Sequence, residues 1–396
     1  MPESHSVWNK GFVLVNLIFF LIFSNISFFY LYPLALKAMG TPNYMIGLVV
    51  GLFSAVTVIS RPFMGKAVSR RGESPIILIG IFTVFMASLG YVFAHSVGLF
   101  TLLTRAVHGL GFSAFIAGSF SLVARTFPPT RRAQAYGVVG AALMSASALS
   151  PPIGETLIKK WGFSSLYLAA CLSAAVAFVL MWTTRRRLLL PSTDQHTSGI
   201  SYRKLIKDRS LFCVLLSTLI FAHCQSTVIN FVALLAISRH SLSGSFFTYT
   251  FATAIFFLLA FANRIDRLGK RLFLRLSYPL LVLGLFLIPA TLGGDFASLT
   301  AVMFGAALGL LFPVHNALAA DHGSISEKAG VMSLFTATYD TGFVTGAMVS
   351  GWVAQQLGLD QLFVLTSALA LGGFFAVLLA PIKSQQSKDY PMGLGP

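Results

Sequence analysis

Long apolar segments recur along this chain from its first residues to its last. A bilayer core about 30 Å thick requires roughly 20 residues of α-helix to cross it, and by that measure the sequence contains twelve spans. We expect them at residues 11–33, 45–64, 76–95, 98–123, 135–157, 164–183, 211–237, 245–263, 273–292, 297–319, 330–352 and 361–381. The sequence therefore predicts an all-α, multi-pass membrane protein.

The composition leads to the same class of protein. Hydrophobic residues make up 56% of the chain and charged residues only 10%, whereas a soluble domain carries about 25% charged residues. A net charge of +16 is also found in nucleic-acid-binding proteins, but here the basic residues flank apolar spans. We therefore expect a lipid bilayer around the chain and no nucleic acid as partner. The three cysteines lie inside spans and form neither a disulfide framework nor a metal-binding pattern.

The basic residues also predict an orientation. When successive loops are assigned to alternate sides, 22 of the 28 Lys and Arg residues share the side of the N-terminus and four fall on the other. Arg61 and Arg105 remain inside spans. Cytoplasmic loops are enriched in Lys and Arg, so both termini are expected in the cytoplasm. Because one missed helix would scramble this split, the split also supports twelve spans.

The chain divides into two similar halves. A polar, basic linker at 185–209 is expected to separate a six-helix bundle at 1–184 from another at 210–396. The segment HGLGF at 108–112 has a counterpart, LGLLF, at 308–312, and the loops at 65–75 and 262–272 share an [SD]-R-x-G pattern. Many secondary transporters are built from such repeats, with the substrate site between them.

These loops carry a resemblance to the major facilitator superfamily that extends over essentially the whole chain. The first loop matches the family's Gly-x-x-x-Asp-Arg-x-Gly pattern at Gly65, Arg70 and Gly72, but Ser69 replaces the aspartate and Glu73 stands where a base is usual. The second loop matches at Asp266, Arg267, Gly269, Lys270 and Arg271. The resemblance implies two pseudo-symmetric six-helix bundles, with both loops gating the cytoplasmic side through a charge network.

Two further patterns resemble the exporters of this family. Arg105-x-x-His108-Gly-x-Gly is similar to the family's Arg-x-x-Gln-Gly-x-Gly, with histidine in place of glutamine. Ser-Pro151-Pro152-x-Gly154 resembles the Gly-Pro-x-x-Gly signature of exporter branches. Tyr339-Asp340, together with Arg61-Pro62, suggests the bacterial drug- and arabinose-efflux-like branch, and hence a proton-coupled antiporter of the inner membrane. Opine-metallophore exporters show a similar pattern.

Charged residues inside the spans are the first candidates for function, because a charge in a bilayer is costly. Arg105, His108 and Asp340 are predicted to take part in proton coupling. The alternatives are an arginine that reaches water at the membrane surface, a structural histidine, and an Arg61–Asp340 pair that links the halves. Glu155 is expected to be a solvated residue at the outer rim.

The resemblance also implies a central cavity lined by spans one, four, seven and ten. Its polar candidates are Asn25, His223, Gln225, His315 and Asn316. Few charges among many aromatic and serine residues favour an amphipathic or zwitterionic small molecule as substrate. We expect a monomer that carries this molecule and protons, without a cofactor or metal.

Two other classes of function lack their usual sequence signatures. No nucleotide-binding loop and no nucleophile–base or metal constellation occurs in the sequence, so ATP drive and enzymatic activity are not expected. Proton-coupled uptake, carriage of a metallophore, siderophore or sugar, and a non-transporting membrane sensor remain the alternatives.

Overall fold

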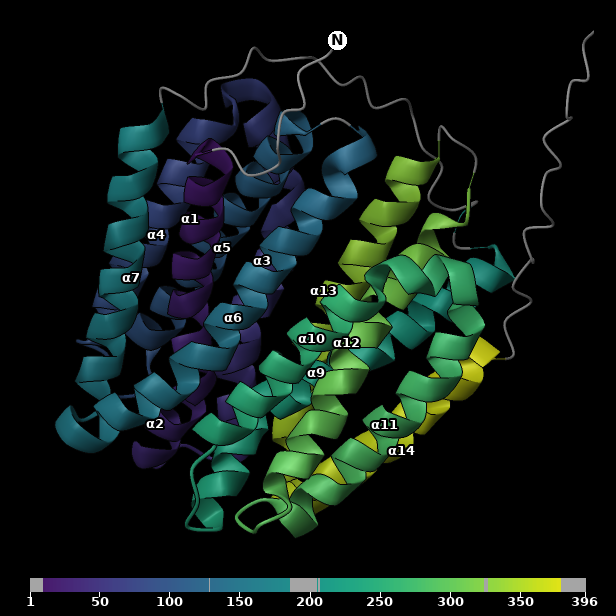
Figure 1. Cartoon of the computed structure of the whole chain (residues 1–396). Helices are drawn as coiled ribbons and strands as arrows, with labels where there is room; N and C mark the ends of the chain where they lie inside the picture. The colour runs from purple at the N-terminus through teal and green to yellow at the C-terminus, as the bar shows by residue number, and fades with distance from the viewer. Residues whose placement is uncertain (1–9, 128, 186–204, 206, 324–326, 379–396) are drawn as a thin grey trace, which may run out of the picture.

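The computed structural model describes residues 10–127, 129–185, 205, 207–323 and 327–378, and this part of the chain is almost entirely helical (Figure 1). The first half contains α1 (Lys10–Phe28), η1 (Phe29–Leu31), α2 (Tyr32–Ala38), α3 (Asn43–Arg71), α4 (Glu73–Tyr91), α5 (Leu99–Thr126), α6 (Pro129–Trp161) and α7 (Phe163–Thr184). The second contains α9 (Arg209–Ser238), α10 (Gly244–Leu268), α11 (Lys270–Thr291), α12 (Ala297–Ala320), α13 (Lys328–Leu357) and α14 (Leu359–Leu378).

The twelve predicted spans are confirmed once α1, η1 and α2 are taken as one broken helix. Eleven of the helices in the described ranges are long and apolar enough to cross a membrane. The remaining one, α13, carries Asp340 among several threonines, and it lies packed between α3 and α9. A more polar helix is tolerated there because protein rather than lipid covers much of it. The predicted linker falls almost wholly outside the described residues, at 186–204 and 206.

The first span breaks near its outer end. A short 3₁₀ segment, η1, joins α1 to α2, and Pro33 follows it directly. Proline has no backbone N–H, so the ordinary helical bond to the carbonyl of Phe29 is missing and the helix tightens locally. This break turns the rings of Phe29 and Tyr32 toward α5, where they contact Arg105.

The basic loop expected between spans four and five is much shorter than predicted. Helix α5 continues to Thr126 and α6 begins at Pro129, so Arg125 and Arg131 belong to helices. Helices longer than a bilayer needs extend their polar ends beyond the hydrocarbon, where basic side chains are solvated.

The helices form two bundles that lie side by side, α1–α7 in one and α9–α14 in the other (Figure 1). Between them, α3 packs against α13 and α6 packs against α10. We call the end of the molecule at which α1 begins the inner end, and the opposite end the outer end, after the orientation that the basic residues predict. The two-bundle fold expected from the sequence is confirmed.

Equivalent glycines show that the bundles repeat one design. A Cβ atom on Gly109 of α5 would lie 2.5 Å from the carbonyl oxygen of Phe53 in α3. A Cβ on Gly309 of α12 would lie 2.4 Å from that of Ala254 in α10. Only glycine permits such close approach of two helices. The paired segments at 108–112 and 308–312 therefore perform the same packing role in each half.

Candidate functional site

An ion pair joins the two halves where α3 meets α13. Nη2 of Arg61 donates to Oδ1 of Asp340 at 3.1 Å, and Nη1 contacts the other carboxylate oxygen. The two side chains are 27% and 15% exposed. Each charge compensates the other inside an apolar setting, where breaking a buried pair costs about 3–5 kcal/mol and a partly exposed pair costs less. The expected alternative of a pair linking the halves is therefore present in the structure.

Polar residues of α9 face α13 beside this pair. The hydroxyl of Tyr339 donates to Oε1 of Gln225 at 2.6 Å. His223 Nδ1 and the Thr345 hydroxyl are 3.2 Å apart. Both His223 and Gln225 are buried, at 8% exposed. Two of the predicted cavity residues therefore form hydrogen bonds to α13, the helix that carries Asp340. Asn316 of α12 is partly exposed.

Asn25, another of the predicted cavity residues, lies within its own half. It is fully buried, its amide donates to Ser88 and to the carbonyl of Ala170, and its Oδ1 lies 3.0 Å from Nε2 of His108. The structure therefore brings Asn25 and His108 together inside the first bundle rather than at the wall between the bundles.

His315, in the second bundle, is placed in a similar way. It is fully buried and contacts the hydroxyls of Ser217 and Tyr278 and the carbonyl of Leu311, all in the same bundle. Among the described residues, no group of three or more His, Cys, Asp or Glu side chains is arranged to hold a metal ion.

Arg105 of α5 is 5% exposed, so it does not reach water as a snorkelling arginine would. Its guanidinium carbon lies 4.8 Å from the ring centre of Phe53, 5.3 Å from that of Tyr32 and 5.7 Å from that of Phe29. Such cation–π contacts compensate part of the cost of burying the charge.

Most of each expected loop with the [SD]-R-x-G pattern is helical, and a single glycine separates the two helices. Gly72 separates α3 from α4 with φ +80°, and Gly269 separates α10 from α11 with φ +94°. Glycine adopts this left-handed region without steric cost, so both positions of the repeat require it. Gly65 and Arg70 are exposed near the end of α3. The side chains of Asp266 and Arg267 lie outside the described residues.

The residue after each of these glycines forms an ion pair within its own half. Glu73 begins α4 and binds Nη1 of Arg125 at 2.6 and 2.7 Å, with the Ser121 hydroxyl donating to the same carboxylate. Lys270 begins α11 and binds both carboxylate oxygens of Asp321 at 2.7 Å. The two pairs occupy equivalent places with opposite polarity. Glu73, which departs from the family pattern, thus has a cation as its partner.

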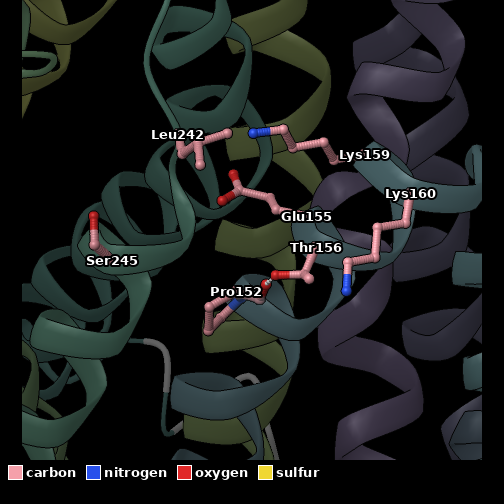
Figure 2. A pocket seen from close by; sticks show the side chains of 7 residues that line it. All are labelled: Pro152, Glu155, Thr156, Lys159, Lys160, Leu242 and Ser245. Atoms are coloured by element: carbon pink, nitrogen blue, oxygen red, sulfur yellow. Dashed lines mark hydrogen bonds between the residues drawn. The ribbon is translucent and has the colours of Figure 1, made fainter.

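At the outer end, the exporter-like segment of α6 meets the start of α10. Pro151 and Gly154 are buried, and the backbone of Pro152 packs against Gly244, where an added Cβ would come within 2.6 Å of Pro152 Cα. Beside this contact lies a pocket of about 560 Å³, lined by Pro152, Glu155, Thr156, Lys159, Lys160, Leu242 and Ser245 (Figure 2).

Glu155 is not the solvated rim residue expected from the sequence. Its carboxylate reaches from α6 to the other bundle. There it accepts hydrogen bonds from the backbone N–H of Ser243 at 2.7 Å, from the Ser243 hydroxyl at 2.6 Å and from the backbone N–H of Gly244 at 2.8 Å. It therefore caps the first turn of α10, where a negative charge is favoured. The sequence around Glu155 did not indicate this capping role, because the residues that it caps lie in the other half of the chain.

The outer ends of α3 and α13 also touch. The N–H of Asn43 donates to Oε1 of Gln355 at 2.9 Å, and its side-chain amide donates to the carbonyl of Ala354. Gly47 and Gly351 are so close that a Cβ on Gly351 would lie 2.7 Å from Cα of Gly47. Further hydrogen bonds cross between the halves at the Arg61–Asp340 pair and where the Thr248 hydroxyl of α10 donates to the carbonyl of Ala148 in α6 at 2.8 Å.

We predict that Glu155→Ala opens the outer end more often. The substitution removes three hydrogen bonds to a charged acceptor, which we value together at about 1–2 kcal/mol because the site is only partly buried. Spin labels at Lys160 and Leu242, both exposed, should report a larger population of long distances. Thr156→Ala is the control, because Thr156 is the next residue in α6 and is exposed. An unchanged distance distribution would show that Glu155 does not hold this end together.

Comparison with known proteins places the chain among membrane transporters. It is 22% identical over 356 residues to the multidrug resistance protein MdtG of Proteus mirabilis (strain HI4320), covering 86% of each chain. Its identity to MdtG of Dickeya zeae (strain Ech586) is 24%, with 90% of each chain covered. The solved human organic anion transporter MFSD10 is 19% identical, with a TM-score of 0.70 and coverage of 92% of this chain and 98% of that one.

A mutant of the peptide transporter POT shares the fold with a TM-score of 0.77 at 15% identity, covering 96% of both chains. The family model described as Major Facilitator Superfamily matches residues 12–294 and 215–393. As its loops and helix patterns predict, the chain belongs to the major facilitator superfamily and is a transporter, not an enzyme.

Proposed function

We propose that this protein is a proton-coupled exporter of small amphipathic or zwitterionic molecules in a bacterial inner membrane. It acts as a monomer with both termini in the cytoplasm, and its halves rock about the α3–α13 and α6–α10 contacts. The observation that carries this proposal is the Arg61–Asp340 ion pair, which joins the two halves inside the membrane.

The distribution of contacts between the halves supports alternating access. Hydrogen bonds from Asn43 and Glu155 hold the halves together at the outer end. At the inner ends, the hydrogen bonds of Glu73 and Lys270 join helices of the same bundle. Rocking of one repeat against the other exposes a site between them to one side at a time. This arrangement is the one expected when the outer side is closed.

Proton coupling follows from the chemistry of the pair. A carboxylate held by an arginine between moving halves can exchange that partner for a proton, so that protonation of Asp340 releases Arg61 and changes the contact between α3 and α13. Arg105 and His108 lie deeper inside the first bundle and are proposed to respond to the same movement through α3, since Phe53 contacts both of them.

Export of a multidrug type is supported by the similarity to MdtG, which is named as a multidrug resistance protein. The aromatic surroundings of Tyr339, which contacts the rings of Phe221, Phe312 and Phe343, suit a substrate with an apolar body. Carriage of a metallophore, siderophore or sugar is not favoured by any contact in the described residues.

Proteoliposomes provide the test. Purified protein is reconstituted with an amphipathic fluorescent dye such as ethidium, and a proton gradient of either sign is imposed. We expect dye movement against the flow of protons, which a protonophore abolishes. Movement that is indifferent to the gradient would refute proton coupling, and the absence of movement for every dye and zwitterion tried would refute this substrate class.

The proposed orientation has its own test. Cysteines introduced at Ser192 and Ser326 should react with an impermeant maleimide only after the cells are opened, whereas a cysteine at Gly294, beside the outer end of α11, should react in intact cells. The three natural cysteines lie inside spans, and a variant lacking them is the background. Reaction of the Gly294→Cys protein only in opened cells would invert the orientation.

A further inference from the structure

We propose that Arg105 and the hydroxyls of Tyr32 and Tyr167 form a binding site for a small monovalent anion inside the first bundle. The three side chains come from α5, α2 and α7, and they meet near the outer end of the bundle. This site is separate from the Arg61–Asp340 pair, and its occupation does not depend on the direction of transport.

The charge of Arg105 is buried without a counter-charge. Among the described residues, no carboxylate forms an ion pair with it, and the carboxylates of Glu73 and Asp340 are bound to Arg125 and Arg61 instead. Aromatic faces offer only partial compensation, worth about 2 kcal/mol at a desolvated site. An isolated buried cation costs considerably more, so a negative partner is required.

Unpaired donors surround this charge. Nε of Arg105 and the hydroxyls of Tyr32 and Tyr167 have no hydrogen-bond partner among the described residues. Arg105 is 5% exposed, Tyr32 0% and Tyr167 4%, so bulk water does not satisfy them. The guanidinium carbon of Arg105 lies 5.3 Å from the ring centre of Tyr32, and the ring centres of Tyr32 and Tyr167 are 6.2 Å apart, so the three side chains are neighbours.

The hydrogen-bonding groups near Arg105 supply no negative charge. Because the amide nitrogen of Asn25 donates to Ser88 and to Ala170, its Oδ1 is the acceptor for Nε2–H of His108. Nδ1 of His108 is then an acceptor, and it receives the hydroxyl of Tyr91 at 3.4 Å. The hydroxyl oxygen of Tyr91 also lies beside the Arg105 side chain, so this chain directs a neutral acceptor, and no negative charge, toward Arg105.

A single anion would both neutralise the charge of Arg105 and accept hydrogen bonds from the unpaired donors. It accepts from several donors at once and neutralises the guanidinium, whereas a water molecule adds two further donors and no charge. One uncompensated positive charge selects a monovalent anion. The rings of Phe29 and Phe53 pack around the guanidinium, so a small anion is the expected ligand. A halide ion and the carboxylate of a small molecule share this chemistry.

The test measures binding to purified, detergent-solubilised protein and uses no transport. Thermal unfolding is followed at constant ionic strength while sodium gluconate is replaced by sodium chloride, bromide or acetate. A ligand that binds the folded state raises the midpoint in a saturable way. We expect chloride and bromide to do so. A rise with acetate of equal size would identify a carboxylate group as an equally good occupant.

Variants connect the effect to this site. Tyr167→Phe removes one donor and should weaken the apparent affinity for chloride about tenfold, and Arg105→Gln should abolish the response. Tyr278→Phe is the matched control, because it removes a buried hydroxyl that is bound to Ser217 in the other bundle. If Arg105→Gln does not fold, Tyr167→Phe alone decides. Unfolding midpoints that are equal in all four salts, or a response unchanged in Tyr167→Phe, would overturn the proposal.

Discussion

Asp340→Asn should reduce proton-driven transport to background while the protein still inserts into the membrane. The substitution keeps the size of the side chain but removes the charge that holds Arg61 and the group that exchanges a proton. Residual movement of substrate down its own gradient should no longer depend on pH. Flux in proteoliposomes at several pH values, beside the yield of monodisperse protein, measures both effects.

A purely structural ion pair leads to a different result. In that case Asp340→Asn loses folded protein, because Arg61 is left as a partly buried charge without its partner, and Arg61→Gln combined with Asp340→Asn restores it. Asp360→Asn is the matched control, since it breaks an exposed pair with Arg239 in the same half, in which Asp360 is 53% exposed. Wild-type flux with an unchanged pH profile in Asp340→Asn would exclude this residue from coupling.

Gly351→Leu is expected to abolish transport by preventing closure of the outer end. The Cβ alone would lie 2.7 Å from the carbonyl oxygen of Asn43 and from Cα of Gly47, and the rest of the leucine has no space between two backbones. Overpacking of this kind costs about 1–3 kcal/mol for modest insertions, and separating α3 from α13 relieves it. Spin labels at the exposed outer positions Lys37 and Gln356 should show the halves moving apart.

The control for this prediction is another helical glycine. Gly372 in α14 is exposed, and an added Cβ there meets nothing within 4 Å, so Gly372→Leu should transport normally. Should Gly351→Leu transport at the wild-type rate with unchanged spin-label distances, the approach of α3 and α13 would not be needed for the cycle.

The number of helices and their division into two bundles could be predicted because each span is long and uniformly apolar. The Arg61–Asp340 pair could be anticipated for a related reason. Charges inside apolar spans are few, and each needs a partner, so the possible pairings in a known fold are limited.

The direction in which the polar side chains point could not be predicted in the same way. A buried span is apolar on the side of lipid and on the side of protein, so its sequence does not show which way Asn25 or His315 points. The expectation for Glu155 was wrong because its partner Ser243 lies 88 residues away in the sequence. The partner of Glu73, Arg125, lies 52 residues away and could not be identified from the sequence either. Contacts over such separations depend on how the helices are assembled, and no local pattern records that.

The two inner ion pairs of opposite polarity give the halves unequal stiffness. Glu73 at the start of α4 and Arg125 at the end of α5 both carry the sign that the dipole of their helix favours, whereas Lys270 at the start of α11 and Asp321 at the end of α12 carry the opposite signs. The second pair is also more exposed, so salt screens it more strongly. We therefore expect one of the two similar bundles to loosen first. As ionic strength rises, hydrogen exchange should become faster where the start of α11 meets the end of α12 before it does where the start of α4 meets the end of α5.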